Sequence, residues 1–193
     1  MKFRLVYEGP LPSNGDRDVK QSIRRQLHPQ LIELWNQPPL CEAHEIQCEI
    51  RCEQDSTSTD YTPYQHRGPF RFLPLIARWL DLTCALDILF LRREAPGSLV
   101  SGGDIDNRIK TLFDALRVPE ENELPKQDDP IVNEDPFYCL LEDDSLITRV
   151  NIETDRLLTA NSSSANSSNV FLIIQVCSVP IRVSGLNLLI AGT

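Results

Sequence analysis

The sequence lacks any hydrophobic run long enough to cross a membrane. Its 193 residues contain no stretch of about 18 consecutive apolar residues, the length that a transmembrane helix requires. Residues 1–15 also lack the apolar segment and the small-residue cleavage site of a secretory signal peptide. We therefore expect a protein of the cytoplasm without a membrane partner.

Metal-binding arrangements of cysteine and histidine are also missing. The six cysteines include no C-x-x-C pair, and the three histidines are scattered without the spacing of zinc ligands. Cys48 and Cys52 would share one face of a predicted strand with Ile46 and Ile50, where free cysteine packs as a small hydrophobic side chain. We predict structural roles for the cysteines, since disulfides rarely persist in the cytoplasm.

Positive charge is scarce, because 28 acidic residues against 19 Lys and Arg leave a net charge of −9. The imbalance is local: residues 119–155 hold twelve acidic residues and two basic ones, whereas the rest of the chain is close to neutral. An acidic chain is at first sight a poor partner for nucleic acid, whose phosphates attract Lys and Arg. Because the acidity is confined to one segment, a basic patch elsewhere is not excluded.

Hydrophobic periodicity predicts a single α+β domain over residues 1–193. Alternating or continuous apolar patterns predict strands at 2–8, 44–53, 82–91, 146–153 and 170–176. Residues 181–190 are either a last strand or a tail packed on the sheet, and residues 137–141 are a short apolar run. Helical spacing predicts two main helices, at 16–35, kinked or broken at Pro29, and at 106–117.

These elements suit a two-layer sandwich in which the helices cover a mixed sheet of about five or six strands. Residues 70–80 are expected to be a short helix or irregular. Residues 118–136 are expected to form a solvated acidic insertion without fixed structure, and the Asn/Ser-rich residues 159–169 a flexible loop.

The most informative segment is GGDIDNRIKTLFDALR, at 102–117. On a helical wheel with about 100° per residue, Asp106, Lys110 and Asp114 fall on one side. Asn107 extends this polar stripe. The apolar residues lie on the opposite side and can pack against the sheet, so the stripe is predicted to face solvent or a groove.

Two explanations remain open for the acidic residues at the start of this helix. An Asp near a helix N-terminus can cap free backbone N–H groups and complement the helix dipole. Capping accounts for one Asp and less well for the crowding of Asp104, Asp106 and Lys110 at one end. A divalent cation accounts for it better, since Mg²⁺ prefers carboxylates, waters and substrate phosphates. The later EDD run at 142–144 is either a turn before a strand or a third carboxylate brought to the same site.

Three short runs of the sequence carry a more specific pattern: G-P-L-P-S-N at 9–14, D-I-D-N-R-I-K-T-L-F-D-A-L at 104–116 and D-D-S-L-I at 143–147. They resemble, in this order, a P-P-S-N turn, a D-x-D-N-x-x-K-x-x-x-D-A-L motif and a D-D-x-x-V/I element. These are the motifs of the RusA family of Holliday junction resolvases. The close matches cover a minor part of the chain, but they are spread from residue 9 to residue 147.

The resemblance implies a homodimeric endodeoxyribonuclease that cleaves branched DNA with Mg²⁺, or with Mn²⁺ as a substitute. It would resolve four-way junctions by paired symmetric nicks in DNA recombination and repair. The motif positions imply these roles: Asp104, Asp106 and Asp144 as metal ligands, Asp143 as their neighbour with a shared or supporting role, and Lys110 as the catalytic lysine. Asn107 and Asp114 match positions expected to hold the geometry of the site.

Metal ions bound by clustered carboxylates both activate water and neutralise charge on a phosphodiester, so the physical chemistry agrees with these roles.

The first predicted helix and the motif helix also carry basic residues, which are either a solvated face or contacts to DNA phosphates: Arg17, Lys20, Arg24, Arg25 and Arg108.

The long acidic segment before Asp143 and the overall negative charge depart from the family's pattern. Two other functions therefore stay open. One is a metal-dependent nuclease that acts on a different DNA substrate. The other is a non-catalytic protein whose acidic segment mimics DNA or binds a basic partner.

Overall fold

The computed structural model describes residues 1–42, 63–93, 104–158, 169–185 and 187–188. These residues form two long helices and seven strands, so the chain is a mixed α+β protein, as its sequence predicts. The predicted strand at 44–53, the glycine-containing segment before the motif helix and most of the Asn/Ser-rich segment lie outside the described residues. None of the described helices is both long and apolar enough to span a membrane.

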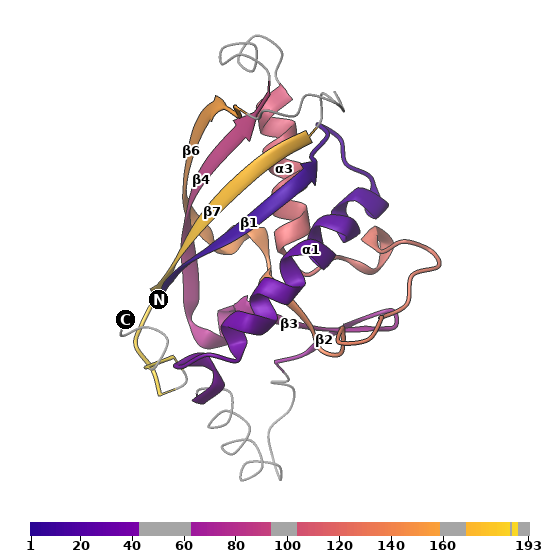
Figure 1. Ribbon diagram of the computed structural model, residues 1–193. Helices are drawn as coiled ribbons and strands as arrows, with labels where there is room; N and C mark the ends of the chain where they lie inside the picture. The colour runs from indigo at the N-terminus through magenta and orange to yellow at the C-terminus, as the bar shows by residue number, and fades with distance from the viewer. Residues whose placement is uncertain (43–62, 94–103, 159–168, 186, 189–193) are drawn as a thin grey trace.

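The larger sheet has four strands, in the order β1 (Lys2–Pro10), β7 (Asn169–Pro180), β4 (Leu82–Arg92) and β6 (Ile147–Arg156) (Figure 1). β7 is antiparallel to both of its neighbours, and β4 and β6 are parallel. Strands close to these ranges are predicted from their apolar patterns. The apolar residues of β4 and β7 alternate towards the helices, which explains why these two strands occupy the centre.

A second sheet of three strands contradicts the expectation of one continuous sheet. Its order is β2 (Gln65–Arg67), β3 (Phe70–Ile76) and β5 (Phe137–Leu141). Residues 70–80, expected to be irregular or helical, instead form β3 and a 3₁₀ turn at Arg78–Leu80. β3 is buried along almost its whole length and contains Pro74, so it has neither the alternation nor the composition that identifies a strand.

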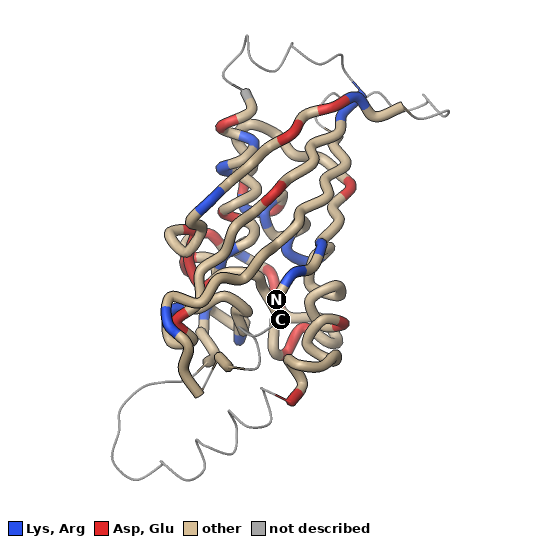
Figure 2. Tube along the Cα trace, turned by 90° about the vertical axis from the view of Figure 1, so that its left-hand side faces the viewer, with Lys and Arg blue, Asp and Glu red and all other residues tan. Residues whose placement is uncertain are grey.

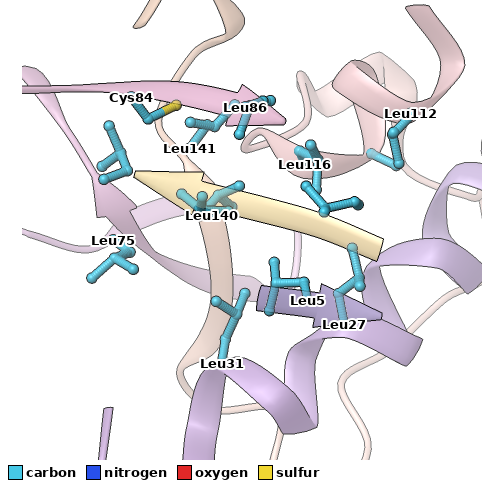
Figure 3. Close-up of a cluster of buried hydrophobic side chains, with 14 of the residues drawn as sticks. Leu5, Leu27, Leu31, Leu75, Cys84, Leu86, Leu112, Leu116, Leu140 and Leu141 are labelled. Atoms are coloured by element: carbon cyan, nitrogen blue, oxygen red, sulfur yellow. The ribbon is translucent and has the colours of Figure 1, made fainter. Parts of the chain in front are cut away.

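Both long helices cover the same face of the four-stranded sheet (Figure 1). α1 (Arg17–Trp35) begins with a cap in which the Val19 N–H donates to Asp16 Oδ1 (2.9 Å), and it continues through Pro29 without the predicted break. α3 (Asp104–Leu116) is the motif helix. Figure 3 shows side chains of both helices, among them Leu31 and Leu116, meeting those of the strands in one apolar cluster.

The acidic segment 118–136 is held against the protein, contrary to the expectation of a solvated insertion. Arg25 of α1 pairs with Asp128 and Glu134, at 2.8 Å each, and Glu134 is only 3% exposed. His28 Nε2 lies 2.8 Å from the carbonyl oxygen of Asn133. The partners of these polar residues come from α1, about a hundred residues earlier, so local composition does not reveal them.

Beyond the last strand, the described residues from 181 to 188 form turns and no further strand. They are nevertheless attached, because the buried Asn187 side chain donates to the carbonyl oxygen of Leu80 (2.7 Å). Of the two expectations for 181–190, a final strand or a tail packed on the protein, the described part agrees with the second.

Candidate functional site

The polar stripe of α3 is exposed where the motif places its first charged residues. Asp106 and Lys110 are both exposed, and their four-residue spacing puts them on one side of the helix. Ile109 and Leu112 lie on the opposite side and are buried in the core. Asp104 is the first residue of the helix. Asp106 and Lys110 therefore place a carboxylate and an ammonium group together on one exposed face of the helix.

The first motif turn packs directly against α3. The buried Arg108 guanidinium donates to the carbonyl oxygen of Leu11 (2.9 Å), and the Gly15 N–H donates to Thr111 Oγ1 (3.1 Å). A Cβ on Gly15 would overlap the Thr111 methyl group, so the close approach requires glycine at this position. The structure thus brings together the 9–14 turn and the first half of the motif helix, which are some 90 residues apart in sequence.

Asp114, the last charged residue of the stripe, faces inward to α1. Its Oδ2 pairs with Lys20 Nζ at 2.7 Å, and its Oδ1 lies 3.5 Å from Arg117 Nη2. The Arg24 guanidinium donates to its backbone carbonyl (2.6 Å). These contacts hold α3 against α1 and thereby fix the direction in which Asp106 and Lys110 are presented.

The basic residues considered as DNA contacts have mostly internal partners. Arg24 is 2% exposed, and burial lowers the pKa of its guanidinium to about 10. Arg108, Lys20 and Arg25 are each engaged in the contacts given above, and Arg17 is exposed. The basic side of α1 is therefore largely a packing surface. Helical spacing alone could not distinguish it from a phosphate-binding patch, because an amphipathic pattern does not reveal which carboxylates face the cations.

The two aspartates of the third motif element have different surroundings. Asp143 accepts hydrogen bonds from the side chain and the N–H of Ser145 and from Arg78 Nη2 (3.2 Å), and the pKa of its carboxyl is lowered chiefly by the Ser145 hydroxyl. Asp144 begins the following 3₁₀ turn and is exposed. Asp143 thus holds the turn and leaves Asp144 as the accessible carboxylate. The D-D-S spacing is a signal for such a cap, whereas no local pattern points to Arg78.

This third element lies at the other end of α3 from Asp106. The N–H of Val118, just after the helix, donates to the carbonyl oxygen of Leu141 (2.9 Å), one residue before the EDD run. Burial lowers the pKa of Arg117, but the carboxylates of Glu123, Asp114 and Asp144 raise it by more, so the pKa lies above its ordinary value. Asp144 is therefore near Arg117, at the end of the helix. With a rise of about 1.5 Å per residue, the helix from 106 to 117 separates the two ends by about 16 Å.

Within the part of the chain that the structure describes, no group of three or more His, Cys, Asp or Glu side chains is close enough to share a metal ion. The Asp104 side chain lies outside that part. The exposed Asp106 and Asp144 carboxylates are the ligand type that Mg²⁺ prefers, so the residue types fit a divalent cation. Two of the three motif elements are in contact, and the third meets the far end of the same helix.

Comparison of the chain with models of protein families, with curated proteins and with solved structures finds no match.

Proposed function

We propose that the chain is a metal-dependent endodeoxyribonuclease of the RusA type that cleaves branched DNA, with the four-way junction as its substrate. The observation that carries this proposal is the division of the motif positions on α3. Asp106 and Lys110 are exposed together on one side, whereas Asp114 holds the helix to α1. Such a division is expected for a helix that presents charged groups to a substrate on a fixed support.

Asp104 and Asp106 would hold the metal ion, since Mg²⁺ is commonly bound by one or two carboxylates together with waters and substrate phosphates. The ion supplies neutralisation of phosphate charge and activation of the attacking water. Asp144 lies towards the other end of α3, about 16 Å along the helix from Asp106, so it would not bind the same ion. Lys110, one turn from Asp106, would donate hydrogen bonds to a phosphate oxygen as negative charge develops there. Asp143 is a positioning residue, because it caps the turn that presents Asp144.

The charges of the acidic segment are compatible with a nucleic-acid substrate. Its acidic residues are in part neutralised by ion pairs within the protein: Glu123 with Arg117, Asp128 and Glu134 with Arg25, and Asp135 with Arg71. A segment whose carboxylates are occupied in this way repels phosphates less than its composition suggests. It is also poorly suited to imitate DNA, which needs regularly spaced free negative charges.

The test is cleavage of a labelled four-way junction beside a linear duplex of the same sequence, with Mg²⁺ or Mn²⁺ at low ionic strength. We compare the wild-type chain with Asp106→Asn and Lys110→Ala. Asp129→Asn, an exposed aspartate in the 118–136 segment, serves as the matched control. We expect paired nicks on the junction with wild type and control, and a loss of about a hundredfold or more in the two site variants.

Each other outcome has a definite meaning. If both substrates are cut and the Asp106→Asn variant cuts neither, the chain is a nuclease with a broader substrate and the junction assignment is wrong. If a folded wild-type chain cuts neither substrate with either metal, the enzymatic proposal fails, and a non-catalytic binding role takes its place. If the Asp106→Asn variant cuts as well as wild type, α3 is not the site.

A further inference from the structure

The outer face of the four-stranded sheet, which points away from α1 and α3, carries apolar side chains on its two central strands. Figure 2 shows this face turned to the viewer with no described helix across it. Four apolar residues, here called the apolar block, form two adjacent rows: Phe171 beside Leu91, and Ile173 beside Leu89. A sheet with one face in water usually places polar residues on that face. Because these four side chains are partly exposed, the outer face is suited to contact another apolar surface.

Carboxylates border the apolar block on both sides. The row of Phe171 and Leu91 ends in Glu8 on β1 and in Asp155 on β6, and the second row ends in Glu153 on β6. The three carboxylates, here called the acidic border, are all exposed. Within the described ranges of the chain, no basic side chain forms an ion pair with any of them.

The next row of the outer face is polar, and its members satisfy one another. Arg4 Nη2 donates to Gln175 Oε1 (3.1 Å), and Gln175 Nε2 donates to Asp87 Oδ2 (3.3 Å). Arg149 Nη2 lies 3.3 Å from the same Asp87 oxygen. This row closes the apolar block at one end. The acidic border has no such internal partners among the described residues, so the part of the face around the apolar block attracts positive charge.

The spacing between the two sides of the acidic border fits an α-helix. β1 and β6 are three strand spacings apart, which is about 14 Å at about 4.8 Å per spacing. A helix with its side chains is about 10–12 Å across. A helix that lies along β4 and β7 can therefore place apolar side chains on the apolar block, while Lys or Arg side chains on its flanks reach the carboxylates on both sides.

The acidic border also disfavours other occupants of this face. DNA and anionic lipid would bring negative charge against the three carboxylates. A second copy of the chain, stacked block on block about a two-fold axis, meets the same difficulty. With the axis along the strands, Asp155 faces Glu8 of the other copy, and with the axis across the strands it faces Glu153.

We propose that the apolar block and its acidic border are the docking surface for a basic amphipathic helix of a partner protein. Such a helix carries apolar side chains at positions i, i+3, i+4 and i+7, with Lys or Arg on either side of this stripe. The docking surface is on the opposite side of the sheet from α3, so a bound partner leaves Asp106 and Lys110 accessible (Figure 1). This inference does not rest on the proposed nuclease activity.

The test is the binding of a synthetic peptide to the full chain, measured by isothermal titration calorimetry and by ¹⁵N NMR. The probe is a helical peptide of about five turns with Leu at the apolar spacing and Lys at the flanking positions. A control peptide has Glu in place of each Lys. We expect the Lys peptide to bind at least about tenfold more tightly than the Glu peptide and to shift the amide signals of Leu89 and Ile173. Absent binding, or equal binding of both peptides, overturns the proposal.

Variants of the chain locate the binding on the outer face. Glu153→Lys reverses one charge of the acidic border, and Leu89→Thr removes apolar surface while it keeps a residue that favours strands. Each should raise the dissociation constant of the Lys peptide about tenfold. Asp129→Lys makes the same change of net charge at an exposed position of the 118–136 segment and should bind the peptide as the wild-type chain does.

Circular dichroism and the urea midpoint verify that each variant is folded. If folded Glu153→Lys and Leu89→Thr variants bind the Lys peptide as tightly as the wild-type chain, the peptide binds elsewhere and the proposal is wrong. If light scattering shows a wild-type dimer that Leu89→Thr converts to a monomer, a second copy of the chain covers the apolar block and the proposal is likewise wrong. The cleavage assay is independent of these measurements, so either proposal can fail without the other.

Discussion

The ion pair between Lys20 and Asp114 offers a quantitative test of how α3 is held. Its nitrogen and oxygen atoms are 2.7 Å apart, and the two side chains are 17% and 13% exposed. Arg117 Nη2 lies 3.5 Å from the other carboxylate oxygen of Asp114, Oδ1. Replacing Asp114 with Ala removes both contacts, but it preserves the hydrogen bond from Arg24 to the backbone carbonyl at this position.

The expected magnitude follows from the burial of the pair. Exposed ion pairs contribute about 0–1 kcal/mol, whereas breaking a fully buried pair costs about 3–5 kcal/mol. With both side chains mostly covered but in reach of water, we expect Asp114→Ala to lower the free energy of unfolding by about 2 kcal/mol. The coupling between positions 20 and 114 in a double-mutant cycle should be about 1 kcal/mol.

Urea unfolding followed by circular dichroism measures this directly. At a denaturant dependence of about 2 kcal/mol per molar, the midpoint of Asp114→Ala should fall by about 1 M. Asp106→Asn, an exposed position on the same helix, should change the stability by less than about 0.5 kcal/mol. A coupling of zero in the cycle of Lys20→Ala and Asp114→Ala would refute the reasoning that this pair fixes α3 to α1.

Three further predictions concern the surroundings of the site. Gly15→Ala should destabilise the protein by about 1–3 kcal/mol because its Cβ meets the methyl group of Thr111, and the additional change Thr111→Ser should recover part of the loss in the same urea assay. Arg25→Gln removes the cation that binds two carboxylates of the 118–136 segment, so cleavage of that segment by a Glu-specific protease should become faster while the rest of the chain is unaffected. Ser145→Ala should raise the pKa of Asp143 towards its ordinary value, which ¹³C NMR of the carboxyl group can follow; because the folded-state pKa is depressed, the stabilisation from this carboxylate is present above its ordinary pKa of 3.8 and disappears as pH falls through the folded-state value.

The parts of the fold with strong periodicity could be predicted from the sequence. The spacing of apolar residues gives α1 and α3 nearly to their ends, and the long apolar runs give β4 and β7. The exposure of Asp106 and Lys110 follows from the same helical geometry. These features depend on neighbours within one or two turns or on one strand, so the sequence contains the whole of the signal.

The features that sequence reasoning missed depend on distant partners. β3 is buried on both sides, so its pattern is indistinguishable from a short buried helix. The acidic segment 118–136 is paired with Arg25 and Arg71, which belong to other elements. Its own composition does not reveal these counterions, and it therefore predicts a solvated segment. The helical spacing of Arg24 is that of a surface cation, but the fold buries this side chain against α3.

The central place of β7 also determines when the protein can fold during synthesis. β1 pairs with β7, and Lys2 lies opposite Cys177 and Pro10 opposite Asn169. This pairing cannot form until β7 has been synthesised. At about 5–20 residues per second, the first strand emerges from the ribosome roughly 8–30 s before the strand that covers its edge. During that interval β4 and β6 are the only described strands of the four-stranded sheet that can pair with each other, and the apolar side of β1 with Leu5 and Tyr7 lacks its neighbouring strand. The edge of β1 that pairs with β7 therefore stays uncovered in the nascent chain until translation has passed residue 177.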